Sequence, residues 1–143
     1  MYAPAHFDEQ RPEVLHALMA AHPLAAVVSA GEAGLVADHI PLLHRPDPAG
    51  HGVLIGHDAR ANPLWRHAGR EHLLIFQGPQ AYISPNWYPS KRVDARVVPT
   101  WNYAVVHAQA TLRAIEDRAG ILAIVGALTA RHEASQPHPW QVG

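Results

Sequence analysis

The chain has 143 residues, of which 48% are hydrophobic and 16% charged, and its formal net charge is −1. This length suits one domain with one hydrophobic core, and the balanced charge excludes a general attraction to nucleic acid or to an anionic membrane. The absence of cysteine excludes disulfides, thiolate metal sites and a cysteine nucleophile. The sequence shows neither a secretion signal nor an apolar run near the ~20 residues that span a bilayer, so we expect a cytoplasmic protein.

The N-terminal part of the chain predicts a helix. An apolar stripe with helical spacing indicates a helix over 8–22, with Asp8 as its N-cap and Pro12 in its first turn, where proline is tolerated. Pro23 then ends this helix. The stripe consists of Val14, Leu15, Leu18 and Met19.

Short apolar runs separated by turn residues next predict strands in hairpin relation. Residues 31–34 supply a hairpin turn, and Pro41 indicates that the second strand is an edge strand or carries a bulge. A short helix over 62–68 interrupts the series, with Asn62 as its cap. Residues 78–79, Gly-Pro, separate the last two strands of this group. The predicted strands are 24–30, 35–43, 53–57, 72–77 and 80–84.

The second half of the chain predicts a loop, a long strand and a helix. Residues 85–96 form the loop, and 100–115 alternates so that its even-numbered positions are mostly small and apolar and should point into a barrel. Residues 118–132 predict a helix capped by Asp117. Successive antiparallel strands framed by helices indicate a mainly β fold, a small antiparallel barrel. The residues of the last helix expected to face inward are Ile121, Leu122, Val125 and Leu128.

No familiar catalytic motif is present: the sequence lacks GxSxG, HExxH, GxGxxG and the P-loop. The histidines are many but scattered, and His67 and His72 lack a chelating spacing, so we expect no metal site. Asp38 and His39 point to opposite faces of one strand, which excludes a dyad between them.

The segment 56–65, GHDARANPLW, places Arg60 and Asn62 where a strand passes into a helix. Helix N-terminal amides point outward at such a place and an arginine adds a bidentate contact, so the segment favours a phosphate. The alternative is that Asn62 only caps the helix and that Arg60 is solvated.

The segment 81–92, AYISPNWYPSKR, offers Ser84, Lys91 and Arg92 beside three aromatic residues. Lys91 is the only lysine of the chain. Aromatic rings beside cationic groups suit a planar anionic ligand, but they equally suit a dimer interface. The other alternative is an aromatic loop packed on its own core.

The segment 98–107, VPTWNYAVVH, places Trp101, Asn102 and His107 on the long strand. Polar groups within an apolar strand usually have a functional or structural reason. His107 on the outer face suits a proton switch or a ligand donor, or a hydrogen bond at a subunit contact.

These segments resemble the PaiB family, known as FMN-binding negative transcriptional regulators. The resemblance covers nearly the whole chain and implies a split β-barrel like that of the pyridoxamine-phosphate oxidases, with flanking helices and with FMN bound at a homodimer interface. The matching blocks are MYAPAHF (1–7), ADHIPLL (37–43), GHDARANPLW (56–65), FQGPQAYISPNWYPSK (76–91), VPTWNYAVVH (98–107), HE (132–133) and PW (139–140).

The resemblance also implies roles for individual residues. By position, Arg60 and Lys91 are candidates for binding the FMN phosphate, with Ser84 and Asn62 as lesser candidates. The residues implied near the flavin ring are His39, Trp101 and Asn102, with His57 and His107 near either end.

Three features depart from the family pattern. Ala110 stands where the family pattern has glycine. Asp58 stands where the family usually has an apolar residue, and its negative charge beside the proposed phosphate contact should weaken FMN binding. Family members also usually continue past Trp140 into another strand with a basic, Ser-Gln-Asn motif. We therefore expect residues 1–143 to form a single split-barrel domain that lacks this C-terminal strand.

Three functions stay open from the sequence. The family implies a flavin-binding regulator of transcription, although no helix-turn-helix or basic stripe supports direct DNA binding. Related barrels also include flavin-dependent oxidoreductases and haem-handling enzymes, but fold analogy is a weak argument for function. The third function is a dimeric binding module without cofactor, which Asp58 and the short C-terminus favour.

Overall fold

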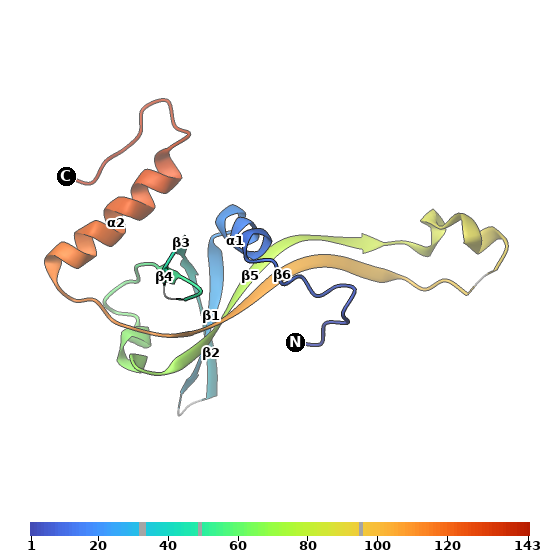
Figure 1. The fold of residues 1–143 in the computed structure, drawn as a ribbon, viewed down its shortest axis with the longest axis horizontal. Coiled ribbons are helices and arrows are strands. Elements are labelled where there is room, and N and C mark those ends of the chain that lie inside the picture. Colours follow the sequence, from blue (N-terminus) through green and yellow to red (C-terminus); the bar gives the residue numbers. More distant parts are fainter. Residues whose placement is uncertain (32–33, 49, 95) are drawn as a thin grey trace.

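The computed structural model describes residues 1–31, 34–48, 50–94 and 96–143. Strands β2, β1, β5 and β6 form one antiparallel sheet in that order, and β3 and β4 form a separate two-stranded sheet (Figure 1). This mainly β, antiparallel fold with two flanking helices matches the expected split-barrel-like class. The elements, with 3-10 helices marked η, are α1 Pro12–Ala21, β1 Leu24–Gly31, β2 Gly34–Pro41, β3 Leu43–Arg45, β4 Val53–Ile55, η1 Pro63–His67, β5 Glu71–Ile83, η2 Pro85–Trp87, η3 Pro89–Arg92, β6 Thr100–Thr111 and α2 Arg118–Glu133.

The core lies between one face of the four-stranded sheet and α1. Side chains from one face of each strand fill this core. Every second residue of β1 points inward, and so do the even-numbered residues in the inner part of β6. Phe76 of β5 is completely buried at the centre. The prediction that the even-numbered positions of β6 face the core is thus confirmed from Ala104 to Ala110, whereas Asn102, nearer the start of the strand, is exposed. The buried apolar cluster consists of Met19, Ala25, Val27, Ile40, Leu42, Leu64, Leu74, Phe76 and Val106.

Strand β2 is an edge strand of the sheet, as Pro41 indicated, and the chain leaves β2 at that residue. The hairpin between β1 and β2 is closed by the pairing of Gly31 with Gly34. Gly34 has a φ of 110°, a conformation that glycine adopts without strain. The remaining turn residues, 32–33, lie outside the described residues.

The expected break at Gly78-Pro79 is wrong, because β5 continues through it as one strand of 13 residues. The irregularity appears instead as a shift of register against β6 between Gln77 and Gln80. A Cβ at Gly78 would lie 3.0 Å from the carbonyl oxygen of Ala104, so glycine permits this close approach of two backbones. A proline is tolerated at such a bulge because the ladder is already interrupted there.

The expected start of the first helix is also wrong. The helix begins at Pro12 with Arg11 as N-cap, and Arg11 makes no side-chain capping bond. Asp8 lies outside the helix and accepts a hydrogen bond of 2.8 Å from the side chain of Gln10. Proline is favoured at a first helical position because its φ is preset and its missing N–H has no partner there.

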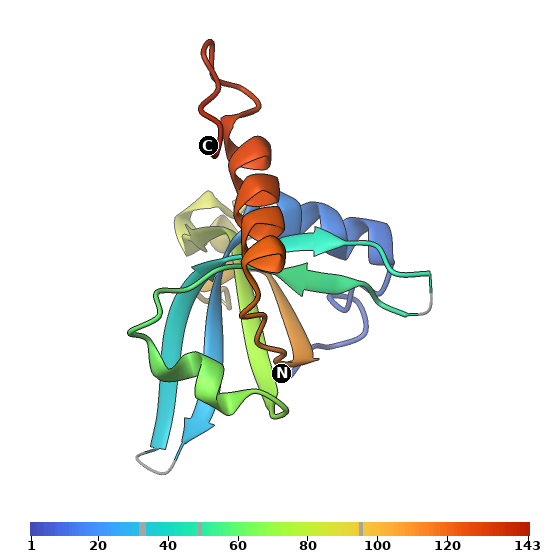
Figure 2. The same ribbon diagram turned by 90° about the vertical axis from the view of Figure 1, so that its left-hand side faces the viewer.

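Helix α2 begins where predicted, and Asp117 caps it by accepting a hydrogen bond of 2.8 Å from the amide of Gly120. The prediction of which α2 residues face inward is wrong in part. Leu128 is 4% exposed, but Ile121 and Leu122 are 43% and 42% exposed, because α2 projects from the sheet (Figures 1 and 2). Neither this helix nor any other in the described part of the chain is long and apolar enough to cross a bilayer.

A buried polar pair joins β1 to β5 inside the sheet. Ser29 and His72 are 2% and 4% exposed, and Ser29 Oγ lies 2.9 Å from His72 Nδ1. His72 Nε2 lies 3.4 Å from the carbonyl oxygen of His67, which can only accept a hydrogen bond. Both contacts are satisfied when Nε2 carries the proton and Nδ1 accepts from the serine hydroxyl.

We expect Ser29→Ala to lower the free energy of unfolding by about 1–3 kcal/mol, because it leaves a buried imidazole nitrogen without a partner. Urea unfolding followed by tryptophan fluorescence measures this change. Ser90→Ala, at an exposed position of η3, serves as control and should stay within about 0.5 kcal/mol of the parent. Equal stabilities of the two variants would show that the Ser29–His72 contact contributes nothing.

Candidate functional site

The residues from His57 to Asn62 form a compact turn between β4 and η1, called here the 57–62 turn. Asn62 caps η1, because its side-chain oxygen accepts a hydrogen bond of 2.9 Å from the amide of Leu64. Its side-chain nitrogen donates to Asp38 of β2 over 2.7 Å. Both ends of the Asn62 amide are therefore engaged within the chain, as the capping alternative expected.

Arg60 points from the same turn to a surface pair with Glu116, the residue before the cap of α2. The guanidinium nitrogen and the carboxylate oxygen are 3.0 Å apart, and both side chains are more than half exposed. The guanidinium also lies 4.3 Å from the centre of the Trp65 ring, a cation–π contact. Arg60 is thus held by an aromatic face and a carboxylate, and it remains accessible from solvent.

The other proposed phosphate-binding residues, Ser84 and Lys91, lie on an arm, defined here as residues 80–92 and 100–103, which include η2, η3 and the outer part of the β5–β6 hairpin. Ser84 caps η2 by accepting a hydrogen bond of 3.2 Å from the amide of Asn86. Lys91 in turn donates to the side-chain oxygen of Asn86. The structure therefore brings Ser84 and Lys91 together through Asn86, on the outer end of the arm.

The aromatic residues of the arm are exposed rather than packed on a core. Trp101 and Tyr82 face each other across the two strands, with ring centroids 6.0 Å apart in an edge arrangement. Trp101 is 57% exposed and Trp87 is 66% exposed. The alternative of an aromatic loop buried against its own core is therefore wrong. Asn102, opposite Ala81, is also exposed.

The three candidate histidines lie on the main body, apart from the arm. His39 is exposed on the edge strand β2, and His107 is exposed on β6 opposite Ile75. His57 lines a small hollow of about 220 Å³ together with Trp140 and Glu133. In this hollow the carboxylate of Glu133 accepts a hydrogen bond of 2.9 Å from the amide of Trp140, which joins the HE and PW motifs.

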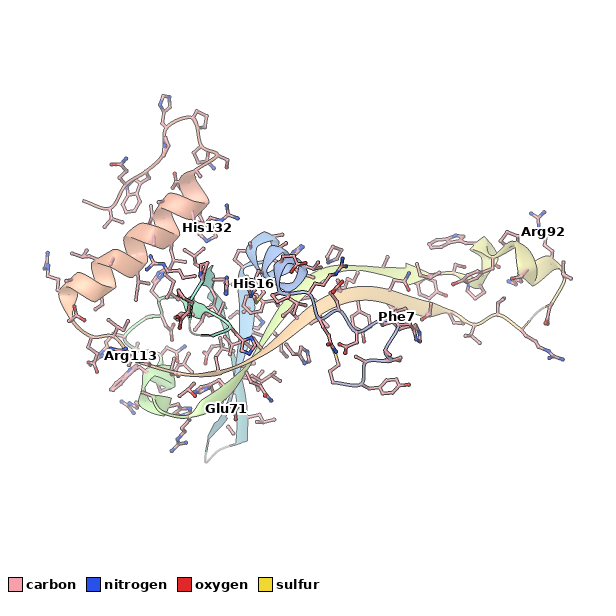
Figure 3. The ribbon with its side chains drawn as sticks, viewed as in Figure 1. Phe7, His16, Glu71, Arg92, Arg113 and His132 are labelled. Atoms are coloured by element: carbon pink, nitrogen blue, oxygen red, sulfur yellow. The ribbon has the colours of Figure 1, made fainter. Side chains whose placement is uncertain are left out.

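Within one chain, Arg60 and Lys91 are too far apart to contact the same phosphate group. Strand β5 separates the 57–62 turn from η3, and its 13 residues extend over roughly 40 Å at the usual rise of a strand. Figure 3 shows this separation: Arg92, the neighbour of Lys91, lies at the outer end of the arm, and Arg113 lies at the opposite end of the hairpin.

Sequence reasoning missed two residues that shape these clusters. Glu116, the partner of Arg60, is 56 residues away along the chain, and no spacing rule connects the two. Asn86 is different, because a Ser-Pro-Asn run is typical of a capped turn and therefore signals the role of Ser84.

The fold and these exposed clusters define a mainly antiparallel, split-barrel-like domain with separated cationic candidates for an anionic ligand. A family model described as "Putative FMN-binding domain" matches residues 1–143, and the chain belongs to this family, which includes the PaiB proteins.

Three relatives illustrate the family. The "Protease synthase and sporulation protein PAI 2" of Bacillus subtilis (strain 168) is 36% identical over 75% of this chain and 50% of its own length. "Uncharacterized protein YKL070W" of Saccharomyces cerevisiae is 36% identical over 73% of this chain and 63% of its own. "Uncharacterized protein AN0679" of Emericella nidulans is 30% identical over 79% and 56%. The matched region thus spans between 50% and 63% of the length of these relatives.

We expect Asn62→Ala to lower the free energy of unfolding by about 1 kcal/mol through loss of the cap. Asn62→Ser keeps a capping oxygen and should lose less. Urea unfolding of both variants measures the difference. Full stability of Asn62→Ala together with impaired FMN binding would contradict the capping role and place Asn62 among the phosphate ligands.

Proposed function

We propose that the protein binds FMN across an interface between two copies of the chain, and that it acts as a PaiB-like negative regulator of transcription. The observation that carries the proposal is the family match over the whole chain together with the separation of Arg60 from Lys91. A second copy that lays its arm along the 57–62 turn supplies the missing cation to each site.

Charge supports a composite site. The Arg60 guanidinium is already paired with the Glu116 carboxylate, and the Asp58 carboxylate lies in the same turn. A phosphate dianion therefore meets little net positive charge at this turn alone. Lys91 and Arg92 from a partner arm add two cations, and arginine and lysine are the usual phosphate ligands in proteins.

The exposed aromatic surface of the arm supports the same arrangement. Contiguous exposed apolar surface rimmed by polar groups marks interaction sites, and aromatic residues are enriched in interfaces. Trp101 and Tyr82 therefore suit contact with a second copy and with the flat flavin ring. The remaining candidates, among them His39, Asn102 and His107, lie on surfaces that such a partner could reach.

A complementation experiment tests the composite site. We expect Arg60→Gln and Lys91→Gln each to weaken FMN binding roughly ten- to hundredfold, because each removes a charge-assisted contact to the phosphate. Consider a mixed dimer in which one copy carries Arg60→Gln and the other carries Lys91→Gln. One of its two sites then lacks both Arg60 and Lys91, and the other site keeps both. Fluorescence quenching of FMN should therefore regain parent affinity at half the sites of the purified mixed dimer.

The control is a mixed dimer of the doubly substituted chain and the unsubstituted chain. Each of its sites lacks either Arg60 or Lys91, so neither site is intact. Loss of binding in the mixed dimer of the single variants would contradict a composite site. Unchanged FMN affinity in both single variants would remove Arg60 and Lys91 from the cofactor site.

We propose further that the effect on transcription is indirect, since the chain has a net charge of −1 and its arm cations are assigned to the cofactor. The FMN-loaded protein should show no binding tighter than micromolar to a mixed-sequence DNA duplex at about 150 mM salt, because non-specific binding depends on released counterions. An electrophoretic mobility shift measures this. Tight binding that survives this salt concentration would make the protein a direct DNA binder.

A further inference from the structure

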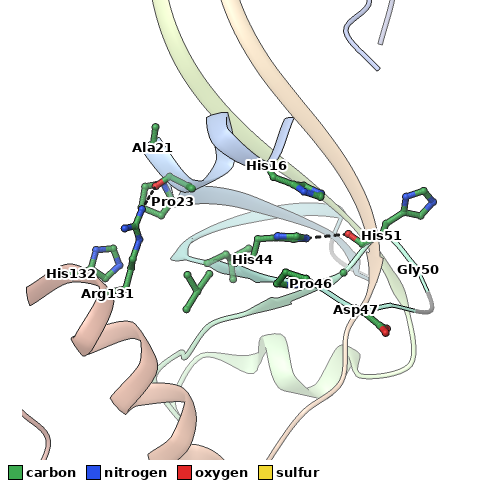
Figure 4. Close-up of a pocket in the computed structure, with 14 residues that line it drawn as sticks. His16, Ala21, Pro23, His44, Pro46, Asp47, Gly50, His51, Arg131 and His132 are labelled. Carbon is green, nitrogen blue, oxygen red and sulfur yellow. Dashed lines mark hydrogen bonds between the residues drawn. The ribbon is translucent and has the colours of Figure 1, made fainter. Parts of the chain in front are cut away.

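A cavity of about 560 Å³ lies on the body of the molecule, between α1, the β3–β4 hairpin and the last turn of α2 (Figure 4). None of its lining residues is among the residues proposed to bind FMN. Its volume is within the range of small-molecule sites in proteins. The cavity therefore requires its own explanation.

Imidazole rings form one wall of this cavity. The rings of His16 and His44 are stacked, with centroids 3.8 Å apart and planes inclined by 26°. His44 Nε2 lies 3.1 Å from the carbonyl oxygen of His51, so this nitrogen carries a proton and donates it. The loop from β3 to β4 thereby fixes the orientation of the His44 ring beside the cavity.

Arg131 forms the opposite wall, on the last turn of α2. One guanidinium nitrogen donates to the carbonyl oxygen of Ala20 at the end of α1 over 3.5 Å, which leaves its other N–H groups for a ligand. Figure 4 shows Arg131 and the stacked histidines on different sides of the same space. The surface between them is apolar and includes Pro23, Leu42 and Leu43.

The charges that surround this cavity favour an anion. The pKa of His16 is lowered, first by burial and then by the positive charge of the stacked His44. An anion bound beside the rings adds a negative charge and therefore favours protonation of His16. The other ionisable groups around this pair are Glu13, Asp47, His51, Arg131 and His132.

A metal ion fits this cavity less well than an anion. Within the described residues, no group of three or more His, Asp or Glu side chains has a geometry that could hold a metal. A guanidinium beside the histidines also repels a cation. Arginine, by contrast, is the usual partner of carboxylate and phosphate.

We propose that this cavity binds a small organic anion, with its carboxylate or phosphate head between Arg131 and the His16–His44 pair and its small apolar body on the surface formed by Pro23, Leu42 and Leu43. Binding takes up a proton on His16. The site is separate from the proposed flavin site.

Isothermal titration of the full chain with benzoate, phenyl phosphate and inorganic phosphate tests the proposal. Benzoate and phenyl phosphate distinguish the two kinds of head on one planar body, and inorganic phosphate tests the head alone. We expect saturable binding of at least one aromatic anion and weaker binding of inorganic phosphate. Benzoate, whose charge is constant between pH 6 and pH 8, should bind severalfold more tightly at the lower pH, because its binding favours the protonated form of His16.

Two variants locate the binding. Arg131→Met should weaken it at least tenfold, whereas Arg118→Met, at the exposed start of the same helix, is the matched control and should leave it unchanged. His16→Phe keeps a ring stacked on His44 but removes the titrating nitrogens, so the affinity should lose most of its dependence on pH. Arg131 is chosen over His132 because His132 also lines the hollow beside His57.

Three results would overturn the proposal: no saturable binding of either aromatic anion, equal binding by Arg131→Met and Arg118→Met, or an FMN affinity that falls in Arg131→Met together with the anion affinity. The last result would make the cavity part of the flavin site. FMN titration of the same samples keeps the two proposals distinguishable, because failure of FMN binding alone leaves the anion site intact.

Discussion

The long pairing of β5 with β6 is the interaction on which both the core of the molecule and the arm depend. Its inner part, from Glu71 to Gln77, supplies Leu74 and Phe76 to the core, and its outer part carries the arm beyond that core. The shift of register at Gly78-Pro79 lies between these parts, where a Cβ at position 78 would meet the carbonyl oxygen of Ala104. One hairpin thus both forms half of the four-stranded sheet and places Lys91 far from Arg60.

The separation of the arm from the core explains why the aromatic residues of the arm are exposed in a single copy of the chain. Helix α2 contributes no residue to the buried apolar cluster, although its Leu128 is itself buried. The aromatic residues of the arm are also largely exposed on their own chain. Burial of about 100 Å² of apolar surface is worth roughly 2.5 kcal/mol, so a surface of this kind gains by meeting a partner. The proposed dimer and the proposed cofactor cover the same exposed rings.

Local patterns were enough to predict much of the fold and little of the site. Asn62 and Asp117 predict the starts of their helices because capping is a contact between near neighbours in the sequence. The alternation of β6 is likewise predictable, because it follows from the two-residue period of a strand. The continuity of β5 was missed because Gly-Pro ordinarily breaks a strand, and only the approach of Ala104 explains the exception. The cavity of His16 and Arg131 joins three distant segments, which no spacing along the chain reveals.

The same limit applies to Arg60, whose role depends on what surrounds it rather than on its motif. The resemblance placed Asp58 beside the phosphate contact as an opposing charge, and in the structure Asp58 Oδ1 also accepts a hydrogen bond of 2.8 Å from the amide of Ala59. The carboxylate that reaches Arg60 is that of Glu116. An exposed ion pair of this kind contributes little to stability and yields readily to a stronger ligand. In the proposed dimer, a phosphate that binds the cations of the partner arm would therefore displace Glu116, whereas a phosphate that meets Arg60 alone has no such advantage.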